Sequence, residues 1–332
     1  MDIRTRLEKR EESFLTPYAA FSSKSRGRVY KEEPCPYRTD FQRDRDRIIH
    51  SKAFRRLKHK TQVFISPEGD HYRTRLTHTL EVTQIARSAA RALGLNEDLT
   101  EAIALGHDLG HTPFGHTGED ALNEVVPGGF KHNEQSLRVV EILEKRNDRY
   151  RGLNLTYEVR NGILCHTGDK KPDTLEGEIV CLADKIAYVN HDLEDAIRAG
   201  ILFPEDLPDV ALDLGKNSAQ RINTLVRGLI EYSFGKGKIS LSPDLDNKLS
   251  EIRDFLFRTV YIGSSAKSEE QKAQTMLKML YHYYVRNPEE NEWLLEVEDL
   301  ERAACDYVAG MTDRFAVHEF TRLFIPRPWI EL

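Results

Sequence analysis

The feature that most constrains this chain is a dense group of histidines and acids that follows an apolar run at residues 102–105. Between Gly106 and Glu119 the chain carries His107, Asp108, His111, His116 and Glu119. Imidazole and carboxylate groups together suit a divalent ion such as Mn, Fe, Ni, Zn or Mg. A helix C-terminus also favours His and Gly, but a cap needs one glycine rather than three histidines and two acids. The pattern therefore predicts a helix that ends at a metal-binding turn.

The composition is that of a soluble globular protein. The chain has 332 residues, of which 39% are hydrophobic and 31% charged, which is enough for one large domain or two ordinary ones. A net charge of −6 argues against a general coat for nucleic acid. Residues 43–60 depart from this balance, with eight Lys or Arg against Asp44 and Asp46. This local excess indicates either an anionic ligand or a solvated helix face.

Cysteine usage and hydropathy indicate a cytoplasmic location. Cys35, Cys165, Cys181 and Cys305 lie far apart in the sequence and form no CxxC motif. This spacing is typical of reduced thiols in a cytosolic protein. Residues 1–12 are highly charged, and no stretch approaches the roughly 20 apolar residues that span a membrane. We therefore expect a cytoplasmic protein with no membrane partner.

Helical periodicity dominates the chain, and no alternating pattern of strands stands out. Residues 1–40 are polar and predict an extended arm that covers a neighbouring subunit or lies over the site. Helices are expected at residues 41–57, 74–93, 96–107, 132–146, 157–165, 175–199, 218–233, 244–261, 268–286, 297–309 and 312–324. The predicted fold class is all-α, with the arm at 1–40, a core at 41–200 and a helical C-terminal region at 201–332 packed on the core.

Two residues outside the dense group complete a candidate ligand set. His78 lies close to an apolar helical stripe, where a lone histidine is more often a satisfied core residue. Asp184 is flanked by apolar residues, so its carboxylate needs either a salt bridge or a metal. Together with His107 and Asp108 they form an H…HD…D series over three predicted helices. Two imidazoles and two carboxylates leave octahedral positions open for water or a phosphate oxygen.

This series resembles the HD-domain metal phosphohydrolases. Finer motifs are similar to the bacterial deoxyguanosinetriphosphate triphosphohydrolase family, especially its shorter branch. The matching segments are residues 17–28, 41–51, 54–57, 60–64, 73–78, 107–119, 183–188 and 306–314. The resemblance implies an HD-domain helical core with additional C-terminal helices. It also implies a metal-dependent enzyme that cleaves a deoxynucleoside triphosphate (dNTP), such as dGTP, to the deoxynucleoside and triphosphate.

The resemblance assigns catalytic roles within the 107–119 segment. The four residues of the H…HD…D series match the metal ligands, and water attacks the α-phosphorus. His116 matches the catalytic histidine and Glu119 the carboxylate that orients it, because a His–Glu pair fixes the tautomer and raises the basicity of the ring. His111 matches a position beside the phosphates. We therefore expect these three residues to form the catalytic group.

Further matches assign contacts with the triphosphate, whose negative charge requires cationic donors. Arg75 and Lys185 match phosphate-binding positions in the wider group of dNTP triphosphohydrolases. Arg56 and Gln62 lie in two of the matching segments and are predicted to contact substrate. For Arg56, as for the other basic residues of the 43–60 segment, a subunit contact is an equal alternative.

The sugar is the other predicted contact. Asp184, Tyr188 and Asp192 recur every four residues and so lie on one face of a helix. By resemblance, Tyr188 packs against the deoxyribose and leaves no room for a 2′-hydroxyl, and Asp192 accepts a hydrogen bond from the 3′-hydroxyl. This shared face predicts a reader of the deoxyribose.

Two other functions compete with this interpretation. The first is another HD-type nucleotide phosphohydrolase, such as a nucleotidase or a guanosine-polyphosphate hydrolase. The second is a regulatory protein that binds dNTP or single-stranded DNA with little catalysis, which an intact His116–Glu119 pair disfavours. The resemblance also implies a homo-oligomer, either a tetramer or a hexamer, and single-stranded DNA as a candidate partner.

Overall fold

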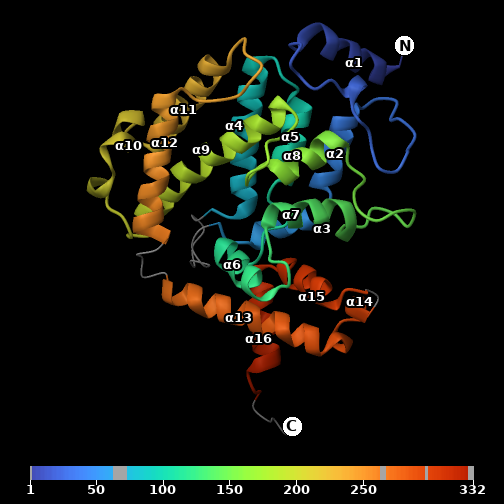
Figure 1. Cartoon of the computed structure of the whole chain (residues 1–332), viewed down its shortest axis with the longest axis vertical. Coiled ribbons are helices and arrows are strands. Elements are labelled where there is room, and N and C mark those ends of the chain that lie inside the picture. The colour runs from blue at the N-terminus through green and yellow to red at the C-terminus, as the bar shows by residue number, and fades with distance from the viewer. Residues whose placement is uncertain (1, 63–72, 262–266, 296–297, 328–332) are drawn as a thin grey trace.

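The computed structural model describes residues 2–62, 73–261, 267–295 and 298–327. Within these ranges the chain forms α-helices joined by short 3₁₀ and π turns (Figure 1), and its β pairings are isolated bridges such as that between Thr61 and Thr74. The predicted all-α class is confirmed. None of the helices described is both long and apolar enough to cross a membrane.

Most of the expected helices are present, and local signals explain several of their ends. Thr74 caps α4 by accepting a hydrogen bond from the backbone N of Thr77, and Gly94 ends α4 in the left-handed conformation at φ 65°. The α-helices are α1 (Ile3–Phe14), α2 (Asp40–Ile49), α3 (Lys52–Arg56), α4 (Arg75–Leu93), α5 (Glu97–Gly106), α6 (Gly115–Val125), α7 (His132–Arg138), α8 (Tyr157–Cys165), α9 (Leu175–Arg198), α10 (Asp209–Leu214), α11 (Ser218–Ser233), α12 (Pro243–Leu256), α13 (Lys267–Arg286), α14 (Glu292–Leu295), α15 (Leu300–Ala309) and α16 (Asp313–Phe324).

The single helix predicted at 41–57 is wrong, because the chain forms two helices there. α2 ends at Ile49, and the side chain of Ser51 accepts a hydrogen bond from the backbone N of Phe54, which starts α3. A serine in this position stabilises a helix N-terminus and so favours a break over a continuous helix. Because of this break, the basic residues of α3 do not continue the helical face of α2.

α9 is the central helix of the larger apolar core. It contacts α4, α5, α8, α11 and α12, and it buries Ile179, Ile186 and Leu193 completely. Figure 1 shows α9 running between α4 and α12. Because α4, α5 and α9 all bury side chains in this core, the polar residues at their margins are brought close together.

A second apolar cluster joins α6 to the C-terminal helices α13, α15 and α16. Leu122 of α6, Leu277 of α13 and Ala304 of α15 are fully buried in it. α6 therefore packs against helices that lie more than a hundred residues further along the chain (Figure 1). The division into segments 1–40, 41–200 and 201–332 stays a prediction.

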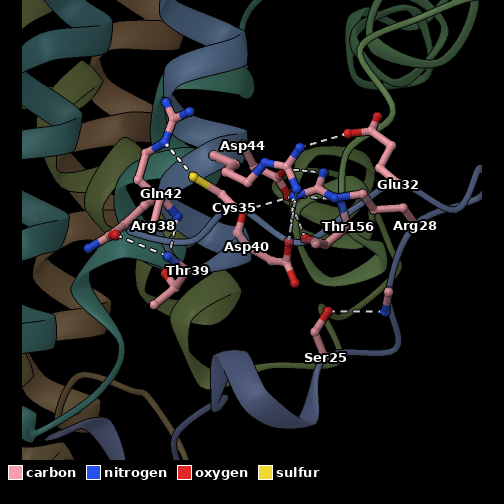
Figure 2. A network of polar contacts seen from close by, with 12 residues as sticks. Ser25, Arg28, Glu32, Cys35, Arg38, Thr39, Asp40, Gln42, Asp44 and Thr156 are labelled. Atoms are coloured by element: carbon pink, nitrogen blue, oxygen red, sulfur yellow. Dashed lines mark hydrogen bonds and ion pairs between the residues drawn. The ribbon is translucent and has the colours of Figure 1, made fainter. Parts of the chain in front are cut away.

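The N-terminal segment differs from the extended arm that the sequence predicted, because it contains α1 and packs on its own chain. Figure 2 shows the Arg28 guanidinium donating hydrogen bonds to the buried Asp44 and to Asp40. Asp44 also accepts a hydrogen bond of 2.6 Å from the Thr156 hydroxyl. These contacts attach the segment to α2 and to the start of α8, and none involves a residue of the predicted site.

Glu176, at the start of α9, is a second attachment point for this segment. One carboxylate oxygen accepts hydrogen bonds from the backbone N of Ala20 at 3.0 Å and of Asn96 at 2.9 Å. The other oxygen is buried without a hydrogen-bond partner among the described residues. Burial raises the pKa of Glu176 to about 7, since the charged form loses its hydration.

We expect Glu176 to make the folded protein less stable as the pH rises. Its pKa is raised from 4.5 to about 7 in the folded state, so the folded protein keeps a proton that the unfolded chain loses between these values. The free energy of unfolding therefore falls across this window, by about 3 kcal/mol for this group. The free energy of unfolding of Glu176→Gln, measured in urea at pH 5 and pH 8, should lack this decrease. Equal pH dependence in the two proteins would contradict the assignment.

Candidate active site

Three helices supply the predicted metal-binding residues. His78 lies on α4, His107 and Asp108 directly follow α5, and Asp184 lies on α9. His78 Nε2 is 3.0 Å from Asp184 Oδ1, and His107 Nε2 is 3.9 Å from that same oxygen. His107 Nε2 is also 3.5 Å from Asp108 Oδ1. The structure thus brings together all four residues of the H…HD…D series.

The ring of His107 shows that this group fits a metal ion. Its Nδ1 lies 2.7 Å from the carbonyl oxygen of Ala104, and since a carbonyl only accepts, Nδ1 carries the proton. Nε2 therefore presents a lone pair, which is buried and has no hydrogen-bond partner among the described residues. A buried unsatisfied acceptor is costly, and a divalent cation would satisfy it. A ligand histidine whose other nitrogen donates to a carbonyl is the usual arrangement at metal sites.

Ser136 of α7 holds the turn that follows the His–Asp pair. Its hydroxyl donates to the carbonyl oxygen of His107 at 2.7 Å and accepts from the backbone N of Gly110 at 2.8 Å. Gly110 has no side chain to obstruct this contact, whereas a Cβ there would lie 2.1 Å from the backbone N of Ser136. The turn is therefore fixed by contacts on both sides of Asp108.

Arg75, predicted to contact phosphate, lies beside the metal-binding group. Its buried guanidinium donates to Asp108 Oδ2 at 2.8 Å. Burial alone would raise the pKa of Asp108, but nearby positive charge, with Arg75 in direct contact, outweighs it and holds that pKa well below its usual range. A cation is therefore in place next to a candidate metal ligand, where a bound phosphate would meet both.

His116 and Glu119 lie on the first turn of α6, which begins at Gly115 after Phe114 at φ 59°. His116 Nδ1 is 3.5 Å from Glu119 Oε2, and the His116 side chain is 75% exposed. The predicted pair is thus formed by helical i, i+3 spacing. With Nδ1 facing the carboxylate, Nε2 is the nitrogen free to exchange a proton.

The sequence interpretation missed His132, which contacts Glu119 more closely than His116 does. His132 Nδ1 lies 2.9 Å from Glu119 Oε2, and its Nε2 lies 3.2 Å from His166 Nε2. His166 donates from Nδ1 to the carbonyl oxygen of Ile163 at 2.8 Å, so its Nε2 is an acceptor. His132 therefore donates from both ring nitrogens, which makes it an imidazolium.

The local electrostatics agree with this proton assignment. The hydrogen bond to Glu119 outweighs burial and raises the pKa of His132. Burial, reinforced by the positive charge of His132, lowers the pKa of His166 to about 3. The hydrogen bonds from His116 and His132 outweigh burial and lower the pKa of Glu119 well below its usual range. His132 and His166 each lie at the end of a helix, as His107 does. In the sequence, this position at a predicted helix end was the feature that could have identified them as site residues.

His111, the third predicted catalytic residue, is buried between these groups. Its ring stacks on His132 with centroids 4.2 Å apart, and its Nε2 is 3.8 Å from Asp108 Oδ1. Burial, reinforced by Arg75, lowers the pKa of His111 well below its ordinary value. His111 is therefore a neutral ring between the metal-binding group and the cationic His132.

Three of the predicted substrate contacts, Lys185, Tyr188 and Asp192, share α9 with Asp184. Tyr188 packs against the larger core, and burial raises its pKa to about 12. Asp192 is buried one turn further along. Lys185 reaches α12 instead of the metal-binding group, with its Nζ 3.4 Å from Asp246 Oδ1.

Gln62 and Arg56 have different neighbours near the metal-binding turn. A Cβ on Gly115 would meet Arg75 Nη2 at 3.0 Å and the carbonyl oxygen of Gln62 at 3.1 Å, so Gln62 adjoins Arg75 and the start of α6. Arg56 instead lines a cavity together with Leu109 and Gly110. The lining of that cavity does not include the other predicted substrate contacts.

Comparison with known proteins places this site in a class. The family model described as "HD domain" matches residues 75–189, which include all four residues of the H…HD…D series. A second model, "Phosphohydrolase-associated domain", matches residues 239–322. The fold resembles that of a phosphohydrolase from Bacteroides thetaiotaomicron, with a TM-score of 0.51 and 16% identity over 83% of this chain and 67% of that one. The chain is a metal-dependent HD-domain phosphohydrolase.

Curated relatives define the family more closely. A "deoxyguanosinetriphosphate triphosphohydrolase-like protein" from Caldanaerobacter subterraneus subsp. tengcongensis is 59% identical over 100% of this chain and 98% of the relative. Proteins of the same description from Clostridium perfringens strain SM101 and Desulfatibacillum aliphaticivorans are 50% and 48% identical, over 98% and 99% of this chain and 99% and 100% of their own. The chain belongs to the family of deoxyguanosinetriphosphate triphosphohydrolase-like proteins, as the motifs in its sequence predicted.

Proposed function

We propose that this protein is a dNTP triphosphohydrolase, which cleaves a dGTP-like substrate to the deoxynucleoside and triphosphate. The observation that carries the proposal is the placement of two separate groups around one turn. The metal-binding group with Arg75 lies on one side, and the His116–Glu119–His132 network lies beside it. Such a pairing suits attack by water on a phosphoester, because one group meets the phosphate while another transfers a proton.

The proposed metal ligands are His78, His107, Asp108 and Asp184. A bound divalent ion of the Mg, Mn, Fe, Ni or Zn type supplies Lewis-acid stabilisation of phosphate charge and activation of water. Arg75 is proposed to contact the phosphate that the metal ion binds. Its guanidinium donates to Asp108, one of the proposed ligands, and so lies next to that ion. His111 adds a neutral ring beside them, as its stacking on His132 places it.

Proton transfer at His116 is the proposed acid–base step. Its Nδ1 faces Glu119, which orients the ring, so Nε2 exchanges the proton with the attacking water or with the 5′-oxygen that leaves. His132 keeps Glu119 charged by donating to it. Glu119 is thus shared by one exposed and one largely buried histidine, and the exposed one is free to meet substrate.

Product analysis tests this function against its alternatives. The protein is incubated with each dNTP and one ribonucleotide in the presence of Mn²⁺ or Mg²⁺, and the products are resolved by chromatography. Tripolyphosphate with deoxynucleoside supports the proposal. Release of orthophosphate or pyrophosphate identifies another HD-type phosphohydrolase, and metal-dependent turnover of any kind excludes a purely regulatory dNTP- or DNA-binding protein.

Tyr188→Ala is expected to relax discrimination against ribonucleotides. The proposed reason is that the ring, one turn from Asp184 on α9, leaves no space for a 2′-hydroxyl. Asp192 is proposed to accept a hydrogen bond from the 3′-hydroxyl, and Lys185 to turn from Asp246 toward the phosphates when substrate binds. Loss of the ring should narrow the ratio of kcat/KM for dGTP over GTP by about tenfold or more, because steric exclusion is then removed. If GTP stays as strongly rejected as by the wild type, Tyr188 does not select the sugar. Gln62 is proposed as a further substrate contact at the same site.

Three other properties stay predictions. These are assembly into a tetramer or hexamer, binding of single-stranded DNA and a cytoplasmic location. Size-exclusion chromatography with light scattering tests the first of these directly, and a monomer in solution would contradict it.

A further inference from the structure

The chain at residues 111–116 leads from the metal-binding turn to the start of α6, and two buried side chains hold it from outside. We call this segment the 111–116 turn. Lys60 donates from Nζ to the carbonyl oxygen of His111. Asp313, the first residue of α16, accepts a hydrogen bond of 3.0 Å at Oδ1 from the backbone N of Phe114. The turn is therefore fixed at two points by residues that are distant in the sequence.

Phe114 is the residue of this turn that most needs such support. Its backbone is left-handed at φ 59° and ψ 26°, and apart from Asn154 no other non-glycine residue among those described has a positive φ. This conformation is unfavourable for a bulky residue and persists only where surrounding contacts enforce it. The next residue, Gly115, is also left-handed at φ 58°. Relaxation of Phe114 to an ordinary backbone conformation would therefore change the direction in which α6 begins.

Asp313 also connects the 111–116 turn with the backbone next to Arg75. Its second oxygen, Oδ2, accepts hydrogen bonds from the backbone N of Thr61 at 2.9 Å and from the Thr61 hydroxyl. Thr61 follows Lys60, whose carbonyl oxygen accepts a hydrogen bond of 3.0 Å from the backbone N of Arg75. A carboxylate accepts several such bonds, and they are stronger than those between neutral groups. Asp313 therefore holds the turn in a fixed relation to a proposed phosphate contact.

The position of the His116 ring depends on where α6 begins. The ring is 75% exposed, and its Nδ1 lies 3.5 Å from Glu119 of the same helix, so this contact moves with α6. Contacts with other elements hold the helix itself. His132 of α7 holds Glu119 one turn into α6, and Asp313 holds Phe114 directly before the helix. The first contact orients the ring through Glu119, whereas the second sets the point from which α6 starts.

We propose that Asp313 is a positioning residue for His116. By holding Phe114 in its left-handed conformation, Asp313 sets the start of α6 so that the His116 ring meets the substrate beside the metal-binding group. Lys60 supports this arrangement by holding the preceding part of the same turn. This role rests on the proposed acid–base step at His116, because Asp313 affects the reaction only through the position of that ring.

Asp313→Ala is expected to lower the single-turnover rate about 10- to 100-fold, because displacement of a reacting group by about 1 Å can cost about 100-fold. Metal content and dNTP affinity should stay close to those of the wild type, since the proposed ligands and substrate contacts are unchanged. Asp313→Asn keeps an oxygen that can accept from the Phe114 amide, so it should lose less. If circular dichroism shows that Asp313→Ala does not fold, Asp313→Asn replaces it in every measurement.

The double variant Asp313→Ala/His116→Ala separates a positioning role from a purely structural one. If Asp313 acts through His116, its removal should change the rate of His116→Ala by less than about threefold, since the two effects are then not independent. A structural role would lower the rates of the wild type and of His116→Ala by the same factor, and this result would overturn the proposal. Loss of the metal ion from Asp313→Ala, or an unchanged rate, would overturn it too.

Hydrogen–deuterium exchange tests the contact without relying on turnover. The Phe114 amide should exchange at least about tenfold faster in Asp313→Ala, since a hydrogen bond to a charged acceptor is lost. Glu319→Gln is the matched control, because Glu319 is also a buried acid of α16 but accepts a hydrogen bond of 2.6 Å from the Tyr284 hydroxyl. It should leave the exchange and the rate within about twofold of the wild type. Equal effects of the two substitutions would overturn the proposal.

The proposed function and the role of Asp313 can fail independently. If the wild type hydrolyses no dNTP, the proposed function is wrong, whereas the exchange of the Phe114 amide still decides whether Asp313 holds the turn. An exchange rate unchanged by Asp313→Ala would overturn the positioning role whatever substrate the enzyme accepts.

Discussion

His107→Ala and Asp108→Ala are each expected to lose bound metal and turnover together. Nε2 of His107 is a buried lone pair with no hydrogen-bond partner among the described residues, and Asp108 lies 3.5 Å from it. Even changes to residues that only support a ligand cost about 10- to 100-fold in metal affinity or activity. Removal of a ligand should therefore lower both by at least about 100-fold. Metal content after reconstitution with Mn²⁺, measured alongside turnover, checks the expectation.

His191→Gln is a suitable control for the metal experiment. His191 is a buried histidine on α9 whose ring centroid is 6.0 Å from that of His78, yet it is not one of the four proposed ligands. Its replacement should leave metal content close to that of the wild type, so a general disturbance of the buried histidines is distinguished from loss of a ligand. Full metal occupancy in both His107→Ala and Asp108→Ala would refute the proposed ligand set.

His116→Ala is expected to lose about 100- to 10,000-fold in single-turnover rate, the usual contribution of general acid–base catalysis. It should nevertheless retain metal and bind dNTP, because His116 lies on α6, outside the three-helix ligand group. The side chain is 75% exposed, so its removal leaves a space that solvent reaches. Added imidazole should enter that space and restore part of the rate.

The contrast with Glu119→Gln and His59→Ala sharpens this test. Glu119→Gln keeps the His116 ring but weakens its orientation, so it should lose rate without responding to imidazole. His59 is an exposed histidine outside the site, and its replacement should leave the rate unchanged. A near-normal rate in His116→Ala, or loss of the metal ion from it, would assign His116 a different role.

Short-range physical chemistry made several parts of the molecule predictable. Thr74 and Gly94 mark the ends of α4 because a side-chain cap and a left-handed residue act within one turn of the helix. The His116–Glu119 pair follows from the i, i+3 spacing once α6 has formed. Asp184, Tyr188 and Asp192 share a face of α9 for the same geometric reason. The all-α class and the H…HD…D series could likewise be predicted from the sequence.

Tertiary structure alone decided which of these parts meet. His132 contacts Glu119, and His166 contacts His132, because α6, α7 and α8 converge beside the end of α5, and no periodicity links residues 13 and 34 positions apart. Ser51 ends the expected long helix and redirects α3, so Arg56 lies in a cavity with Trp293 and not with Arg75. Sequence patterns report interactions between near neighbours along the chain. The shared proton network and the surroundings of Arg56 depend on packing between distant segments, and therefore only the folded molecule reveals them.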